Sequence, residues 1–123
     1  MITHKSIIGN IRTYKQRVGK SQTTSGDEFK VTLIRKDNHK KMTFSFYDNL
    51  YNKATLSRML ECLILDRVSF LDYKKYEDFC WAFGYDPQNK ESKDCYNGCR
   101  EETTKLNKFF TRREIEVLSS YYL

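Results

Sequence analysis

The spacing of the apolar residues changes near residue 53, and this change is the strongest constraint on the fold. Before it, apolar residues alternate with polar ones over residues 29–33 and 42–47, as in strands that bury one face. After it, Leu56 begins a set of apolar residues that recur three or four positions apart, as on one face of a helix. The chain therefore predicts an α+β fold, with a sheet from its first half and helices from its second.

The expected sheet is small and antiparallel, with two or three strands. Residues 35–41 join the two alternating segments, and they include Asp37 and Asn38, which suit a hairpin tip because they tolerate left-handed backbone conformations. Residues 11–18 alternate more weakly and offer a third strand, followed by a flexible connection over residues 19–26. A hairpin alone is marginally stable, so its apolar face needs a third strand or a covering helix.

About four helices are expected in the second half. The first follows the N-cap residue Thr55, and the second spans residues 73–83 before Gly84, which suits a left-handed helix end. The third begins near Asn89, and the fourth opens with a capping box at Thr111. Each of these cap residues satisfies backbone groups that a helix end leaves free.

The predicted core joins the two halves into a single domain over residues 1–123. The strongest helical stripe consists of Leu56, Met59, Leu60, Leu63 and Ile64. We expect the sheet face that carries Phe44 and Phe46 to pack on this stripe. Phe79 and Phe83 of the second helix should cover the same face of the sheet. A mass of 14.8 kDa is about that of one domain.

The apolar residues are too scattered for a membrane segment. No apolar run approaches the roughly 18 residues that a spanning helix needs, and residues 1–20 hold no apolar stretch of the kind found in secretory signals. We therefore expect no membrane contact and a cytoplasmic location. In that reducing compartment the four cysteines should be free thiols.

The cysteines and histidines raise the questions of metal binding and nucleophilic catalysis. Cys95 and Cys99 are four residues apart on a predicted helix and offer two ligands for zinc, whereas a lone thiol on an apolar stripe, such as Cys80, usually acts as a small buried hydrophobe. We favour buried packing for the cysteines, including Cys62, and predict no metal. His4 near a mobile terminus and His39 at the hairpin tip lie outside any expected rigid site, so no Cys–His pair is predicted.

Neither the carboxylates nor the glycines form a catalytic motif. The acidic residues of the second half gather near Glu77 and near Glu102, which is typical of solvated helix faces. The five glycines never approach the spacing of a phosphate-binding loop. We therefore predict a protein that is not an enzyme and needs no cofactor. The alternative, a small metal-dependent enzyme, requires bound metal.

The positive charge lies in the first half of the chain. Residues 1–53 hold eleven Lys and Arg against four acids, a net charge of +7, whereas residues 54–123 hold eleven against twelve, a net charge of −1. The candidate contact residues on the predicted strands and hairpin are Arg12, Lys15, Arg17, Lys30, Arg35, Lys36, Lys40, Lys41 and Tyr47. Such cations pair with phosphates independently of base sequence, and a tyrosine stacks on unpaired bases. The alternatives are an acidic protein surface as the partner, or charge that serves only solubility.

Several segments resemble one group of small proteins. The matching positions are residues 29–33, 43–47, 54–66, 76–80 and 83–86, together with Tyr96, Cys99, Lys105 and Leu106. In these segments, within residues 28–110, the chain resembles small proteins encoded by tailed phages and prophages. The resemblance implies an α+β shape and a phage accessory gene, and no particular activity. The chain departs from the pattern over residues 48–53, at Gly98 and after Phe110.

The resemblance leads to the first of two functional hypotheses. Accessory genes of phages commonly encode proteins that block host defence, including CRISPR–Cas inhibitors, which are typically small, non-enzymatic and bound to a Cas surface. We therefore expect a non-enzymatic binding protein, similar to an anti-CRISPR, that contacts a host nucleoprotein effector through the basic hairpin over residues 30–41. The second hypothesis is an accessory protein of phage DNA or RNA metabolism that binds nucleic acid through the same surface.

Overall fold

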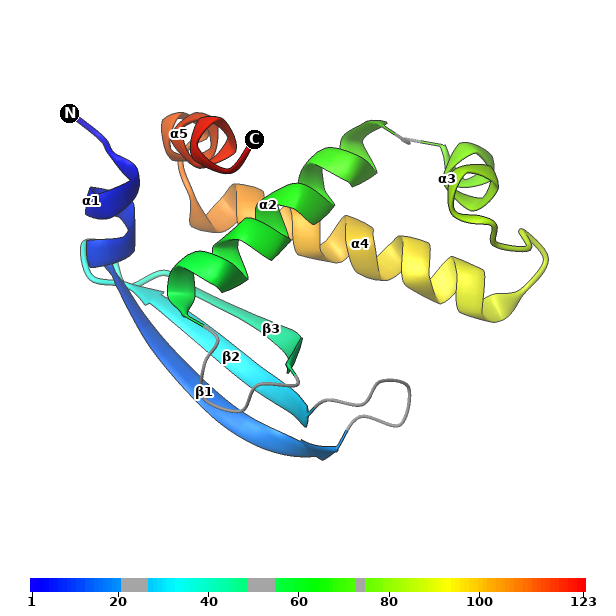
Figure 1. The fold of residues 1–123 in the computed structure, drawn as a ribbon, viewed down its shortest axis with the longest axis horizontal. Helices are drawn as coiled ribbons and strands as arrows, with labels where there is room; N and C mark the ends of the chain where they lie inside the picture. The colour runs from blue at the N-terminus through cyan, green and yellow to red at the C-terminus, as the bar shows by residue number, and fades with distance from the viewer. Residues whose placement is uncertain (21–26, 49–54, 73–74) are drawn as a thin grey trace.

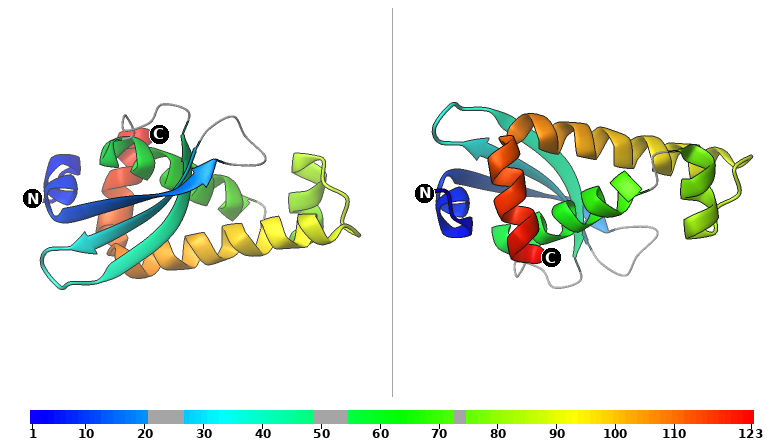
Figure 2. Two further views of the ribbon diagram at one scale, coloured as in Figure 1. Left: turned by 90° about the horizontal axis from the view of Figure 1, so that it is seen from below. Right: turned by 90° about the horizontal axis from the view of Figure 1, so that it is seen from above.

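The computed structural model describes residues 1–20, 27–48, 55–72 and 75–123, and these residues form an α+β fold (Figure 1). In chain order the elements are α1 (His4–Gly9), β1 (Ile11–Lys20), β2 (Asp27–Arg35), β3 (Lys41–Asp48), α2 (Leu56–Asp72), α3 (Tyr76–Phe83), α4 (Lys90–Phe109) and α5 (Arg112–Tyr122). The helices α2, α4 and α5 lie on one side of the sheet (Figures 1 and 2). The expected fold class is therefore confirmed.

The three strands form one antiparallel sheet in the order β1-β2-β3. Val31 of the central strand is opposite Lys15 of β1 and Phe44 of β3, so these three side chains share a face of the sheet. Val31 is fully buried and Phe44 is nearly so, which places this face against the helices. The weakly alternating segment 11–18 is thus a full strand, and it continues to Lys20.

The turn between β2 and β3 follows the chemistry of its residues. The amide of Arg35 donates to the carbonyl of Lys40 over 2.9 Å, and the amide of Lys40 donates to the side-chain oxygen of Asn38 over 3.0 Å. His39 has a positive φ of 62°, a conformation in which histidine is commoner than most residues. The predicted hairpin tip is confirmed, and His39 is the residue that takes the left-handed conformation.

The cap residues set several helix ends as the sequence predicts. The Thr55 hydroxyl accepts the amide of Arg58 over 3.2 Å, and the Asn89 side chain accepts the amide of Glu91 over 2.9 Å. Gly84 ends α3 with a φ of 72°, the left-handed conformation that glycine adopts without strain. These contacts involve only neighbouring residues, so each of these ends is determined locally.

The main core lies between the sheet and helices α2, α4 and α5. All five residues of the α2 stripe take part in it, and Met59, Leu60 and Ile64 are fully buried. The other buried members are Ile7, Ile11, Phe29, Val31, Leu33, Met42, Phe44, Leu106, Phe109, Phe110, Ile115 and Leu118. Phe44 is 4% exposed and Phe46 is half-buried against this cluster. The expected packing of the sheet on α2 is therefore confirmed.

Helix α3 does not cover the sheet, contrary to the expectation from its apolar stripe. Phe79 and Cys80 are buried, but they lie outside the cluster that contains the sheet residues. Phe79 instead packs edge-on against Tyr96 of α4, with 5.3 Å between ring centroids. Figure 1 shows α3 at the end of the molecule that is remote from the sheet. Phe83 is half-exposed and Trp81 is 87% exposed, so this end presents aromatic rings to solvent.

Helix α1 has no counterpart among the predicted elements. The Thr3 hydroxyl accepts the amide of Ser6 over 3.1 Å, and the Ser6 hydroxyl accepts the amide of Thr3 over 2.9 Å. This capping box has serine where glutamate or glutamine is usual, which makes the pattern weak in sequence. His4 consequently lies in a folded helix with its Nε2 2.7 Å from the Tyr122 hydroxyl. The expectation that His4 lies near a mobile terminus is wrong.

Candidate polyanion-binding groove

A groove of about 670 Å³ opens between the β2–β3 hairpin, the end of α4 and the start of α5. The six cations that line it are Arg35, Lys40, Lys41, Lys105, Lys108 and Arg112. Its described lining residues also include two asparagines and Thr111, but neither Asp nor Glu. We call this hollow the basic groove. Its uniform sign of charge is suited to an anionic partner.

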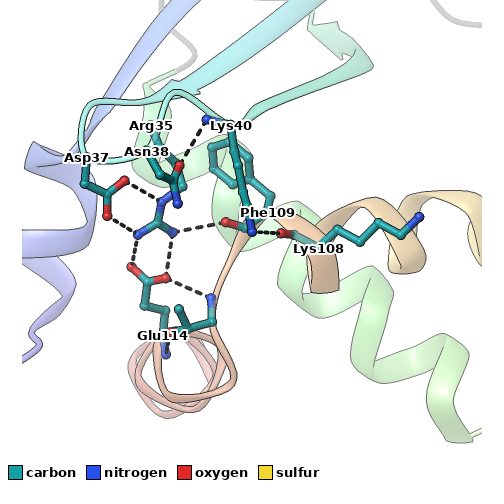
Figure 3. Close-up of polar contacts among 8 residues, drawn as sticks. Arg35, Asp37, Asn38, Lys40, Lys108, Phe109 and Glu114 are labelled. Atoms are coloured by element: carbon teal, nitrogen blue, oxygen red, sulfur yellow. Dashed lines mark hydrogen bonds and ion pairs between the residues drawn. The ribbon is translucent and has the colours of Figure 1, made fainter.

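Contacts to carbonyl groups hold the hairpin against the end of α4. The Arg35 guanidinium donates to the carbonyl of Phe109 over 3.0 Å, and the Lys40 ammonium donates to the carbonyl of Lys108 over 3.4 Å (Figure 3). The last carbonyls of a helix lack partners within the helix and carry partial negative charge. The end of α4 therefore attracts the cations of the hairpin, and this forms one wall of the basic groove.

Arg35 anchors this junction and is not a surface cation. It is 4% exposed, and its guanidinium donates to both oxygens of Asp37 at 2.9 Å and to those of Glu114 at 2.6 and 3.0 Å (Figure 3). Glu114 also closes the capping box of α5, because its Oε1 accepts the amide of Thr111 over 2.8 Å, as the sequence predicts. The sequence places Arg35 among the candidate contact residues. Because it is buried between two carboxylates, its role is structural, and the exposed candidate contact residues do not include it.

The ion pairs fix the charges of all three groups. Hydrogen bonds to Asp37 and then to Glu114 raise the pKa of Arg35, which stays protonated. Burial alone would raise the pKa of Glu114, but the hydrogen bonds from Arg35 and Thr111 outweigh it, and the pKa is lowered. The hydrogen bond from Arg35 likewise holds the pKa of Asp37 well below its usual range. Both carboxylates are therefore ionised at neutral pH.

The lowered carboxyl pKa values predict acid sensitivity. A carboxyl group with a lower pKa in the folded protein stabilises the fold above its unfolded pKa of about 4, and this contribution is lost as the pH falls through the folded value. We expect the free energy of unfolding, measured by urea titration at several pH values, to decrease steadily from about pH 5 downward. Glu114→Gln should make this decrease less steep. An unchanged pH profile in that variant would contradict the assignment.

Three cations of the basic groove have no acidic partner among the described residues, namely Lys40, Lys41 and Lys108. The others are engaged: Lys105 lies 3.9 Å from Glu102, and Arg112 lies 3.6 Å from Glu116. All three unpaired lysines are exposed. Lys40 uses one of its three N–H groups on the Lys108 carbonyl, so all three ammonium groups keep donors for charge-assisted hydrogen bonds to an anion such as phosphate.

The outer face of the sheet carries part of the predicted contact set. Arg12 and Lys41 are both opposite Ile34, so they share the face of the sheet that points away from the helices. Lys30 lies on the same face further along β2, and the exposed Tyr14 lies on this face of β1, opposite Thr32. This face is basic, and of the residues named on it only Lys41 lines the basic groove.

The remaining predicted contact residues lie apart from one another. Lys15 and Arg17 are on the helix-facing side of β1, where both are nevertheless exposed, and Arg17 pairs with Asp27 at 3.2 Å. Lys36 donates to the carbonyl of Gly9 over 2.9 Å. The side chain of Tyr47 lies outside the described residues. The predicted set therefore divides between two faces, and only Lys40 and Lys41 belong to the basic groove as exposed cations.

Half of the groove's cations come from the helical half of the chain, and sequence reasoning missed them. These are Lys105, Lys108 and Arg112. The even charge balance of residues 54–123 conceals a local signal, because residues 103–113 hold four Lys and Arg and no acid. The sequence does not reveal that this stretch meets the hairpin, since the two are more than 60 residues apart.

The described cysteines form neither a metal site nor a reactive thiol pair. All four are free; Cys80 is buried as predicted, whereas Cys62, Cys95 and Cys99 are half-buried. Burial raises the pKa of Cys99 to about 11, so this thiol is protonated at neutral pH and is a weak nucleophile. Among the residues that the structure describes, no group of three His, Cys, Asp or Glu side chains is arranged to hold a metal ion.

A second polar cluster joins α1, α2 and α5. The Ser57 hydroxyl lies 2.8 Å from the Tyr122 hydroxyl and 3.4 Å from Nε2 of His4. The Tyr122 hydroxyl also donates to the carbonyl of Ser57 over 2.8 Å, and burial lowers the pKa of His4. No carboxylate contacts His4 within the described ranges, so the third group of a catalytic triad is missing there. The cluster is a structural junction.

Comparisons with protein families, curated proteins and solved structures found no match to this chain. Among the described helices, none has both the length and the apolar character needed to cross a membrane. The basic groove is therefore interpreted from its own geometry and charge.

Proposed function

We propose that this protein binds nucleic acid, without catalysing a reaction, by holding phosphate groups in the basic groove. The observation that carries this proposal is the groove's lining, which has five exposed cations, beside the buried Arg35, and no carboxylate among its described residues. Lys and Arg neutralise the closely spaced phosphates of DNA and RNA independently of base sequence. The partner of the groove is therefore a nucleic-acid backbone.

Neutral hydrogen-bond donors complete the groove. Asn38, Asn107 and Thr111 lie among its lysines. The Asn38 side-chain oxygen accepts the Lys40 amide, so its NH₂ group remains to donate to a phosphate oxygen. Lysines of the hairpin and of α4 line the groove from two sides, which suits a chain of phosphates that passes between them.

The test is the affinity for a fluorescent duplex and a fluorescent single strand at two salt concentrations. If the three unpaired lysines neutralise three phosphates, raising the salt from about 50 to about 200 mM should weaken duplex binding about 40-fold. Fluorescence anisotropy measures this change directly. Binding that does not respond to salt, or no binding of either nucleic acid at the lower salt concentration, would overturn the proposal.

The second candidate function is the inhibition of a host defence complex through protein contact, as the resemblance to phage proteins implies. The observation that favours it is the aromatic tip, which we define as Trp81, Phe83 and Tyr85 at the α3 end. Trp81 is 87% exposed, and the rings of Phe83 and Tyr85 stack with 6.3 Å between centroids. Exposed aromatic rings are enriched at protein interfaces and supply much of their binding energy.

Co-purification with Cas effector complexes tests this second function. Trp81→Ala should abolish a complex formed through the aromatic tip, whereas loss of the groove lysines should leave it intact. The opposite result would place the effector on the basic groove. Failure to co-purify with any effector of the host would refute the inhibitory function, and it would leave the nucleic-acid measurement unaffected.

A further inference from the structure

The ring of Tyr121, near the end of α5, is 59% exposed although one of its faces is covered. His4 stacks on it with 3.6 Å between ring centroids and an interplanar angle of 6°. Because His4 occupies one face, the exposure belongs to the opposite face and to the ring edge. Tyr121 therefore presents an open aromatic face to solvent, supported from behind by a second ring.

The supporting ring is held in place by hydrogen bonds. Nε2 of His4 lies 2.7 Å from the Tyr122 hydroxyl, which donates to the Ser57 carbonyl at the start of α2. The Tyr122 ring stands edge-on to both His4 and Tyr121. Three helices thus fix the orientation of the stacked pair, so that little freedom is lost when a further ring is added.

A shallow cavity of about 740 Å³, wide open to solvent, lies beside this pair, along the side of α5. It is lined by His4, Tyr121, the cation of Arg113, the hydroxyl of Ser120, the apolar side chain of Val117 and the carboxylate of Glu116. With one cation and one carboxylate the lining has no excess positive charge for a phosphate group, whereas a planar ring with polar edges would find a stacking face and hydrogen-bonding partners. The cavity suits a nucleobase.

The cavity is connected to the basic groove by shared lining residues. Arg112 lines the basic groove and also a smaller hollow that contains Arg67, and Glu116 lines that hollow and the cavity beside Tyr121. The path therefore passes around the first turn of α5. From Arg112 to Tyr121 the helix extends about 14 Å. Figure 2 shows that α5 runs from the hairpin end of the molecule to the C-terminus.

We propose that Tyr121, stacked on His4, is a base-stacking site for single-stranded nucleic acid whose phosphates occupy the basic groove. This proposal rests on the proposed nucleic-acid binding function and specifies its substrate. In a duplex the faces of the bases are covered by their neighbours, and only an unpaired base offers a face to an aromatic side chain. The protein should therefore prefer a single strand to a duplex of the same sequence.

The test compares two single strands of equal length, an oligothymidine and an abasic strand that has the same sugar and phosphate groups without bases. Tyr121→Leu, which keeps apolar bulk but removes the π face, should weaken oligothymidine binding about 5- to 150-fold. The affinity of the Tyr121→Leu variant for the abasic strand should equal that of the unmodified protein. Tyr121→Phe, which keeps the ring, should bind both strands as the unmodified protein does.

Tyr14→Leu is the matched control, because Tyr14 is 54% exposed and lies on the outer face of β1, away from the cavity. Tyr14→Leu should change neither the affinity for oligothymidine nor the affinity for the abasic strand. Equal losses for Tyr14→Leu and Tyr121→Leu, or an equal loss for the abasic strand, would overturn the stacking site alone. Binding of neither strand by the unmodified protein would overturn the proposed function together with the stacking site. Thermal unfolding of each variant confirms that it is folded.

Discussion

Replacing Glu114 by alanine is expected to lower the free energy of unfolding by about 3–5 kcal/mol. The substitution leaves the buried guanidinium of Arg35 with Asp37 as its remaining carboxylate partner, and Asp37 is half-exposed. It also removes the carboxylate that caps the amide of Thr111 at the start of α5. Urea titration at pH 7 measures the effect.

Glu116→Ala is the matched control for Glu114→Ala. Glu116 lies two residues further along α5 and pairs with Arg112 at 3.6 Å, but its side chain is 67% exposed. We expect a change of less than about 0.5 kcal/mol, because an exposed ion pair contributes little. Replacing both members of the buried pair, as in R35M with E114L, should restore part of the stability lost in Glu114→Ala, although the capping contact to Thr111 stays absent. Equal effects of Glu114→Ala and Glu116→Ala would contradict the structural role of the buried pair.

Reversing the charge of the three unpaired groove lysines is expected to weaken nucleic-acid binding at least about 100-fold at low salt. The variant combines Lys40→Glu, Lys41→Glu and Lys108→Glu. The slope of the logarithm of its binding constant against the logarithm of the salt concentration should also be smaller by about three, because three phosphate contacts are lost. Fluorescence anisotropy at several salt concentrations measures both quantities. The free energy of unfolding should fall only modestly, because all three side chains are exposed and the variant loses the hydrogen bond from Lys40 to the Lys108 carbonyl.

The matched control for the groove variant reverses Lys75, Lys90 and Lys93, which are exposed near the α3 end. Each triple reversal lowers the formal net charge by six, from +6 to zero. The two variants therefore differ in the position of the change and not in its size. An equal loss of affinity in both would show that binding depends on net charge alone and would contradict the role of the groove.

Much of the fold could be predicted because it is encoded over short distances along the chain. The alternation over residues 29–33 and 42–47 and the stripe of α2 report burial directly, since each follows the period of its element. The caps at Thr55 and Asn89 act within three residues. Helix α1 escaped prediction because it is short and its capping box uses Ser6.

The candidate groove was only half predictable, since its walls come from distant parts of the chain. The hairpin lysines stand out in a basic stretch, whereas Lys105 and Lys108 lie in a half of the chain with balanced charge. Arg35 looks like its neighbours Lys36 and Lys40 in sequence. Arg35 differs from these lysines because it forms a buried ion pair with Glu114, a residue far away in the sequence.

Helix α3 shows a different limit of sequence reasoning. Its apolar stripe correctly predicts that Phe79 and Cys80 are buried, but a stripe does not specify which surface covers it. The sheet is already covered by α2, α4 and α5, so α3 packs its rings on Tyr96 of α4. The exposed Trp81 is a consequence of that placement, and amphipathic spacing alone does not reveal it.

The buried pair between Arg35 and Glu114 also bears on how the chain folds. The two residues are 79 positions apart, so they meet only after the hairpin, α4 and α5 have assembled. In any partly assembled state that excludes water from Arg35 before α5 arrives, the cation would be buried without Glu114, which is costly. The pair therefore penalises compact states in which α5 is not in place, and it couples the hairpin to a helix 79 positions further along the chain.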